Sequence, residues 1–153
     1  MKNSSKTQLI HVIGIDAGGP QNLPLPLQKL VLSAKRIAAP KRVLEDLPNW
    51  LTKNTKNNIL PEFFCSNKAN ELVLWLKAHI EQTVLLTSGD PLWFGIGRKL
   101  LQEFPAEQLQ FYPSPSSLQL AFARLRRPWQ NASWISLHGR DPEPLSKCLQ
   151  KRP

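Results

Sequence analysis

Three short turns in this chain are rich in glycine, serine and proline and could hold a small ligand. They are Gly14–Pro20, Ser88–Pro91 and Pro113–Ser117. The second turn follows the apolar run Val84–Leu86, and apolar residues at helical spacing follow it over 92–104. A strand, a tight turn and a helix in that order form the unit with which open α/β sheets bind ligands beyond the carboxyl ends of their strands.

The chemistry that these turns offer is binding and positioning. The sequence shows neither a Ser-His-Asp set nor paired carboxylates, and Cys65 and Cys148 fit no metal or redox spacing. We therefore predict no catalytic side chain and no metal ligand. Asp90 has two compatible interpretations, because it could N-cap the next helix with Pro91 in the first position or contact a ligand.

The first turn argues against a dinucleotide cofactor. The dinucleotide fingerprint needs a glycine where Asp16 stands between Gly14 and Gly18, and a carboxylate at that position would repel a pyrophosphate. A cofactor without phosphates is acceptable here.

Predicted strands and helices alternate along the chain. We expect strands at 9–15, 37–39, 84–86, 110–112 and 134–137, with an extended segment at 59–65. We expect helices at 27–34, 41–47, 69–81, 92–104, 118–126 and 144–150, and a surface loop at 49–58. His11 should be a packed strand residue. This alternation predicts one α/β domain with a mainly parallel sheet and helices on both of its faces.

The formal net charge of +9 indicates an anionic partner or a solubilising surface. A small polycarboxylate fits as well as nucleic acid, and scattered basic residues without an RNA-binding motif disfavour nucleic acid. No apolar run is long enough to span a bilayer, so we expect no membrane partner. The polar start is not a signal peptide, and we predict a cytoplasmic protein in which both cysteines are free thiols.

The three turns, in order, resemble those of the tetrapyrrole methylases, which transfer methyl groups from S-adenosyl-L-methionine. Phe94–Arg98 and Ser136–Arg140 are similar to segments of one branch, the precorrin or cobalt-precorrin C5-methyltransferases of cobalamin biosynthesis. The chain departs from the family pattern at three positions of these turns. Asp16 and Ala17 replace a Gly-Pro pair, and Ser114 replaces a glycine.

The resemblance implies a cofactor, a substrate and the residues that bind them. The substrate is a tetrapyrrole with many carboxylates, and the basic candidates to bind them are Lys41, Arg42 and Arg140. The positions that approach S-adenosyl-L-methionine in the family are held here by Ala17, Ser88, Gly89, Asp90, Trp93, Ser116 and Ser117.

The resemblance also implies the domain organisation. Residues 1–8 are a polar tail, 9–137 the tetrapyrrole methylase N-terminal domain, and 138–153 the crossover and the start of a truncated second domain. Family members hold the cofactor between two domains. We therefore expect a homodimer or a second chain that carries the missing domain, and poor turnover by this chain alone. The alternative is a non-catalytic basic module, binding RNA or regulating a partner, that derives from the same fold. The sequence leaves open whether the ring carries cobalt.

Overall fold

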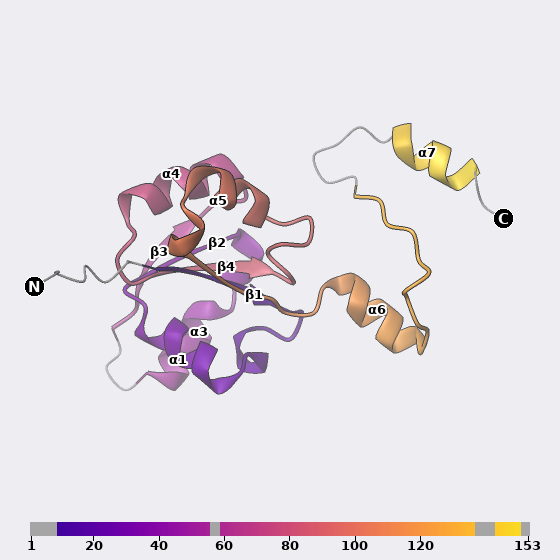
Figure 1. The fold of residues 1–153 in the computed structure, drawn as a ribbon. Coiled ribbons are helices and arrows are strands. Elements are labelled where there is room, and N and C mark those ends of the chain that lie inside the picture. Colours follow the sequence, from indigo (N-terminus) through magenta and orange to yellow (C-terminus); the bar gives the residue numbers. More distant parts are fainter. Residues whose placement is uncertain (1–8, 56–58, 137–142, 151–153) are drawn as a thin grey trace, which may run out of the picture.

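The computed structural model describes residues 9–55, 59–136 and 143–150. Its centre is a five-stranded sheet in the order β3-β2-β4-β1-β5, in which the four pairings between the described strands are parallel. The sheet lies between two layers of helices, and the chain then leaves this body through α6 and α7 (Figure 1). The strands are β1 (Ile10–Ile15), β2 (Arg36–Ala39), β3 (Glu62–Cys65), β4 (Thr83–Ser88) and β5 (Leu109–Tyr112). The helices are α1 (Leu25–Ser33), α2 (Lys41–Leu44), α3 (Leu47–Asn54), α4 (Ala69–Ala78), α5 (Gly97–Glu103), α6 (Ser117–Leu125) and α7 (Glu143–Gln150).

The strands form where the sequence has short runs of β-branched and apolar residues. β1 and β4 lie side by side in the middle of the sheet, with Ile13 opposite Leu86, and both side chains are fully buried. Strands of a parallel sheet are buried on both faces because helices cover each one. Continuous apolar runs such as Val84–Leu86 therefore become central strands.

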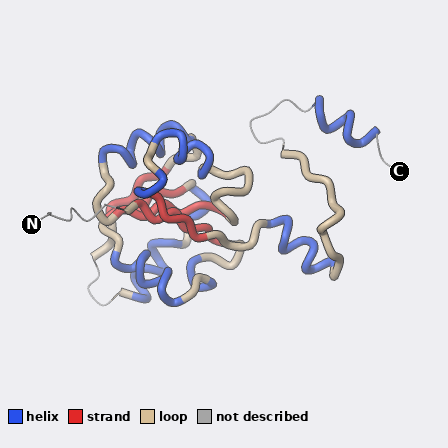
Figure 2. The backbone as a smooth tube through the Cα atoms, viewed as in Figure 1, coloured by secondary structure: helices blue, strands red, loops and turns tan. Residues whose placement is uncertain are grey.

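Helices cover both faces of the sheet, as Figure 2 shows. On one face α1 and α3 pack over a core that includes Ile13, Val31 and Leu51. On the other face α4 and α5 pack over a core that includes Leu76 and Leu100. The predicted α/β class, the parallel sheet and the helices on both faces are confirmed. We call residues 10–112, from β1 to β5, the sandwich.

Residues 49–54 do not form the loop that their polar composition predicts, because they belong to α3. Pro48 lies in the first turn of α3, where its missing amide costs no hydrogen bond, and a second helix starts directly after α2. Leu47 and Leu51 are one helical turn apart and fully buried, so two residues anchor an otherwise polar helix. The prediction of a single helix ending before Pro48 was therefore wrong.

The helix predicted at 92–104 also starts later than expected. α5 begins at Gly97, and residues 91–96 form a turn that is closed by the Gly97 amide donating to the Pro91 carbonyl at 2.8 Å. An added Cβ on Gly97 would lie 2.6 Å from that carbonyl oxygen. The apolar residues in this turn have helical spacing, although the backbone at 91–96 is not helical.

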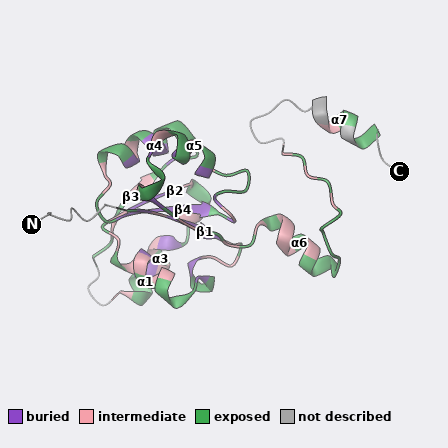
Figure 3. Ribbon diagram, viewed as in Figure 1, coloured by how far each residue is buried: buried purple, intermediate pink, exposed green. Residues whose placement is uncertain are grey.

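The segment after β5 differs from the sandwich, and we call residues 113–136 the arm. It contains α6 and an irregular stretch, and none of its residues is buried (Figure 3). The strand predicted at 134–137 is absent over the described residues 134–136, because those residues pair with no neighbouring strand. α7 confirms the helix predicted at 144–150. Within the described residues, no helix has the length and apolar character needed to cross a membrane.

Candidate ligand-binding cleft

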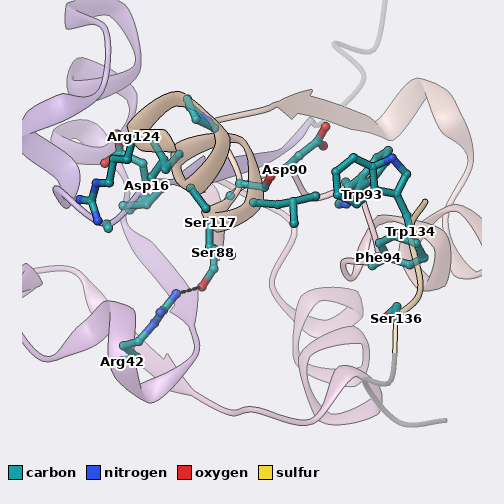
Figure 4. A pocket seen from close by; sticks show the side chains of 18 of the residues that line it. Asp16, Arg42, Ser88, Asp90, Trp93, Phe94, Ser117, Arg124, Trp134 and Ser136 are labelled. Atoms are coloured by element: carbon teal, nitrogen blue, oxygen red, sulfur yellow. Dashed lines mark hydrogen bonds between the residues drawn. The ribbon is translucent and has the colours of Figure 1, made fainter. Parts of the chain in front are cut away.

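A cleft of about 600 Å³ opens at the carboxyl ends of β1 and β4, between the sandwich and the arm (Figure 4). The volume is in the range of small-molecule and cofactor sites. The three glycine- and serine-rich turns meet here. The lining residues from the sandwich are Ile15, Asp16, Ala17, Arg42, Ser88, Gly89, Asp90, Trp93 and Phe94. Those from the arm are Pro115, Ser116, Ser117, Leu118, Leu120, Ala121, Arg124, Trp134, Ile135 and Ser136.

Gly89 is the point where the three turns touch. Its amide donates to the Ile15 carbonyl at 2.8 Å, and its carbonyl accepts from the Ser114 amide at 3.2 Å. Its φ of 64° lies in the left-handed region, and an added Cβ would lie 3.1 Å from the Ser116 Cα. A larger residue would strain the backbone and push the arm away. Glycine at this position therefore lets the turns converge.

Asp90 caps a turn and not the helix. Its Oδ1 accepts from the Leu92 amide at 2.8 Å, and α5 begins only at Gly97. The carboxylate therefore fixes the local backbone, while its second oxygen accepts no hydrogen bond from the described residues. The N-cap interpretation of Asp90 was wrong, because the turn at 91–96 separates it from α5.

Asp16 fixes the first turn in a similar way. Its Oδ1 accepts from the Gly18 amide at 2.8 Å, and the Asn22 side chain donates to both carboxylate oxygens at 3.2 and 3.3 Å. Its backbone carbonyl accepts from the Gly19 amide. This turn leaves Ala17 exposed beside the cleft, where its small side chain leaves room for a ligand.

The third turn joins the arm to the sandwich. Ser114 Oγ donates to the Gly14 carbonyl at 2.8 Å, so the serine that replaces the family glycine supplies an extra tie to β1. Ser116 caps α6 reciprocally with Gln119. Ser116 and Ser117 thus lie at the start of α6 and face the cleft.

The three predicted substrate-binding residues have different outcomes. Arg42 lines the cleft, and its Nη2 donates to Ser88 Oγ at 2.5 Å (Figure 4). Lys41 is exposed and is not among the lining residues, and Arg140 lies outside the described residues. Sequence reasoning missed Arg124, which α6 brings to the cleft. Its position seven residues after Ser117, two turns along one helix face, was the available signal.

Aromatic rings form one side of the cleft, and we call Trp93, Phe94 and Trp134 the aromatic wall. Trp134 contacts Trp93 edge to face with centroids 6.1 Å apart, and Trp93 contacts Phe94 at 5.2 Å. Trp134 also contacts Phe122 and Trp129 of the arm, each at 5.7 Å. The sequence interpretation of Trp134 as a strand residue hid this role.

The titratable pair of the central sheet lies away from the cleft. His11 Nδ1 and Tyr112 Oη are 3.1 Å apart between β1 and β5, and neither residue is among the lining residues. Burial lowers the pKa of His11 and raises that of Tyr112. His11 is thus the packed strand residue that the sequence predicts. Within the described residues, no cluster of three His, Cys, Asp or Glu side chains could hold a metal ion.

Comparison with known proteins places this arrangement in a family. The sequence profile of the Tetrapyrrole (Corrin/Porphyrin) Methylases matches residues 9–151. The chain is 31% identical over 129 residues to the precorrin-6Y C(5,15)-methyltransferase [decarboxylating] of Sinorhizobium sp, covering 84% of this chain and 30% of that protein. It is 28% identical over 140 residues to the probable cobalt-precorrin-7 C(5)-methyltransferase of Methanocaldococcus jannaschii, covering 87% and 62% of the two.

A solved structure has the same fold. The cobalamin biosynthesis precorrin-6Y methylase from Archaeoglobus fulgidus superimposes with a TM-score of 0.60 at 23% identity, covering 89% of this chain and 68% of that one. The chain thus spans 30% of one of the two curated relatives above and 62% of the other.

Proposed function

The chain belongs to the tetrapyrrole methylase family, and from that premise we propose that it is the cofactor-binding part of an S-adenosyl-L-methionine-dependent methyltransferase. Its substrate is a precorrin or cobalt-precorrin, methylated at C5 during cobalamin biosynthesis. The names of the relatives support this substrate, and they favour an enzyme over a non-catalytic basic module. The proposed compartment is the cytoplasm, which is consistent with an exposed, unpaired Cys65.

The convergence of the three turns on one cleft carries this proposal. They are far apart in the sequence, yet Ala17, Gly89 and Ser117 line the same space at the carboxyl ends of parallel strands. This is where open α/β sheets bind their ligands. The proposed cofactor-binding residues are Ala17, Ser88, Gly89, Asp90, Trp93, Ser116 and Ser117, all of which line the cleft.

The donor set and the shape of the cleft fit an adenosyl cofactor without phosphates. Gly89 and Ala17 keep side chains out of the space next to the strand ends. Asp90 offers an oxygen that can accept hydrogen bonds from ribose hydroxyls, and Ser88 and Ser117 offer hydroxyl groups. The aromatic wall closes one side of this space with an apolar surface. Asp16 and Asp90 together would repel a pyrophosphate.

When bound, S-adenosyl-L-methionine supplies an activated methyl group on a sulfonium. The residues of this chain have to hold the cofactor in one orientation and keep water away, since alignment and water exclusion carry most of such a reaction. The turns around Gly89 supply the orientation through backbone hydrogen bonds. Trp93 and Trp134 supply the apolar cover on one side.

We further propose that a second α/β domain, beyond the part described here, completes the active site. The incomplete coverage of the relatives supports this division. It follows that residues 1–153 should bind cofactor more readily than they turn over substrate.

Binding of S-adenosylhomocysteine, measured by calorimetry, tests the proposed function. We expect Asp90→Asn to weaken binding about tenfold, because a carboxylate accepts stronger hydrogen bonds than an amide. Ala17→Phe should abolish binding by filling the cleft, while its melting temperature stays that of the unaltered chain, since Ala17 is exposed. The matched control is Asp46→Asn, because Asp46 is exposed and is not among the lining residues. Equal affinities for all four proteins would contradict the assignment.

A further inference from the structure

Within the described residues, two arginines of the cleft have no acidic partner. Arg42 donates to the neutral Ser88 hydroxyl, and Arg124 makes no ion pair in the part of the chain that the structure describes. The cleft also holds two carboxylates, but Asp16 and Asp90 are bonded to their own turns. A guanidinium can donate five hydrogen bonds and favours a carboxylate acceptor. The cleft therefore has unused capacity for anions.

The two arginines come from opposite parts of the molecule. Arg42 follows β2 in the sandwich, and Arg124 is near the end of α6 in the arm. In the view of Figure 4 both side chains lie on one side of the cleft, and Trp93, Phe94 and Trp134 lie on the other. A ligand that reached both arginines and also met the rings would have to be wide and flat, with separate anionic groups at its edge.

We propose that Arg42 and Arg124 bind two edge carboxylates of the tetrapyrrole substrate while the macrocycle lies toward the aromatic wall. This inference rests on the proposed function and names the residues that recognise the substrate at that site. Binding would exchange the neutral Ser88 acceptor of Arg42 for a charged one, which gives a shorter and stronger hydrogen bond. It would also join sandwich and arm through one ligand.

The position of the two arginines, and not the total charge, makes the proposal specific. Arg127 is exposed three residues beyond Arg124, and it is not among the lining residues. Removing Arg127 lowers the net charge by the same amount as removing Arg124. A diffuse electrostatic attraction would respond equally to both losses, whereas direct binding would respond only to one.

The carboxylate that these arginines bind could also be that of the amino-acid part of the cofactor. Two ligands separate the sources. Uroporphyrin carries carboxylates around a conjugated ring and has no adenosine, and S-adenosylhomocysteine carries one carboxylate and no macrocycle. Binding of each ligand can be measured in solution without turnover, so the measurement does not require a second domain.

The experiment measures uroporphyrin binding by fluorescence and S-adenosylhomocysteine binding by calorimetry, with residues 1–153 and their variants. We expect Arg42→Gln and Arg124→Gln each to weaken uroporphyrin about tenfold, as loss of a charged hydrogen-bond pair does. Arg124→Lys should fall between them and the unaltered chain, since an ammonium keeps the charge but not the paired donors. The control Arg127→Gln should change affinity less than about twofold.

Circular dichroism of each variant confirms that it is folded. Equal uroporphyrin affinity for Arg124→Gln and Arg127→Gln, or no uroporphyrin binding by the unaltered chain, would overturn the inference. So would loss of S-adenosylhomocysteine binding with uroporphyrin unchanged, because the arginines would then bind the cofactor. If the unaltered chain does not bind S-adenosylhomocysteine, it is the proposed function that fails.

Discussion

The sandwich and the arm contribute the two walls of one cleft, but different forces hold them. In the sandwich Ile13, Leu86 and Leu100 are fully buried between sheet and helices. In the arm no residue is buried, and α6 keeps Leu125 64% exposed. The arm depends on a capping box, the Ser114 contacts and edge-to-face ring pairs.

This difference indicates how the cleft works. Burial of apolar surface stabilises the sandwich with about 25 cal/mol for each Å², so the turns around Gly89 are held firmly. Ring pairs and exposed hydrogen bonds contribute about 1 kcal/mol each. The arm should therefore open at a much lower free energy than the sandwich unfolds. A ligand that touches both walls would stabilise the arm.

The joint between the two regions should be the most sensitive point. A Cβ on Gly14 would lie 1.7 Å from the Gly89 carbonyl oxygen and 2.9 Å from the Ser114 amide. Gly14→Ala must therefore move backbone, and we expect the free energy of unfolding to fall by about 4 kcal/mol. The control is Gly18→Ala, whose Cβ has the flexible Asn22 side chain, and not backbone, as its nearest neighbour. Denaturant unfolding that gave the two variants similar stabilities would show that the joint tolerates separation.

A core substitution should act on the whole sandwich. Leu86→Ala removes a fully buried side chain from the face that α1 and α3 cover, and it should cost about 3 kcal/mol of unfolding free energy. Leu74→Ala is the control, because Leu74 is 68% exposed on α4. Urea unfolding followed by circular dichroism measures both variants. A cost below about 1 kcal/mol for Leu86→Ala would contradict the rigidity assigned to the sandwich.

The arm should respond to Trp134→Ala without loss of the sandwich. We expect global unfolding to change by less than about 1 kcal/mol, because the lost contacts are exposed ring pairs. Amide hydrogen exchange should become faster over 117–136 and stay unchanged in β1 and β4. For comparison, Trp50→Ala removes a ring that packs on the sandwich core and should lower global stability. Slower or unchanged exchange in the arm would be evidence against the role of the rings.

The smallest effect is expected at an ion pair between two helices of the sandwich. Hydrogen bonds from Lys77 of α4 and Lys99 of α5 lower the pKa of Glu103 to about 2, from 4.5. Because the folded pKa is the lower one, this contribution is present above pH 4.5 and is lost as pH falls toward 2. Glu103→Gln should thus melt slightly lower than the unaltered chain at pH 7, and this difference should shrink as pH falls to 2. The control Glu107→Gln, which removes a carboxylate without an ion pair in the described residues, should show no such dependence on pH.

The sequence predicts the sandwich well because its apolar residues recur at helix or strand spacing, and these are the residues that the fold buries. β1, β4 and the buried faces of α1 and α4 follow from apolar patterns that also exist in the folded core. The sequence did not predict α3, because its two buried leucines are too few to establish a helical repeat of apolar residues. The turn at 91–96 was also not predicted. Its apolar residues have helical spacing, but they are not all buried, since Leu92 is 54% exposed.

The site residues were predictable in the turns that contain glycine and serine. They were not predictable where tertiary contacts determine whether a residue reaches the cleft. The residues Ala17, Ser88, Gly89 and Ser117 could be named because the three turns resemble those of the family, and they line one cleft. Arg124 and Trp134 could not, because their place depends on the direction of α6 and of the chain after it. Periodicity says nothing about an element that has no buried face. Whether the cleft residues bind the cofactor stays a prediction.

The strand order has a consequence for how the chain folds. β1 is made first, yet its partners in the sheet come late, since His11 pairs with Val84 and with Gln110. At ribosomal rates of roughly 5–20 residues per second, several seconds pass between the synthesis of β1 and that of its neighbours β4 and β5. Contacts between such distant segments also make folding slow. During that interval the apolar edge of β1 is open to wrong partners, so we expect yield on expression to depend on chaperones and temperature.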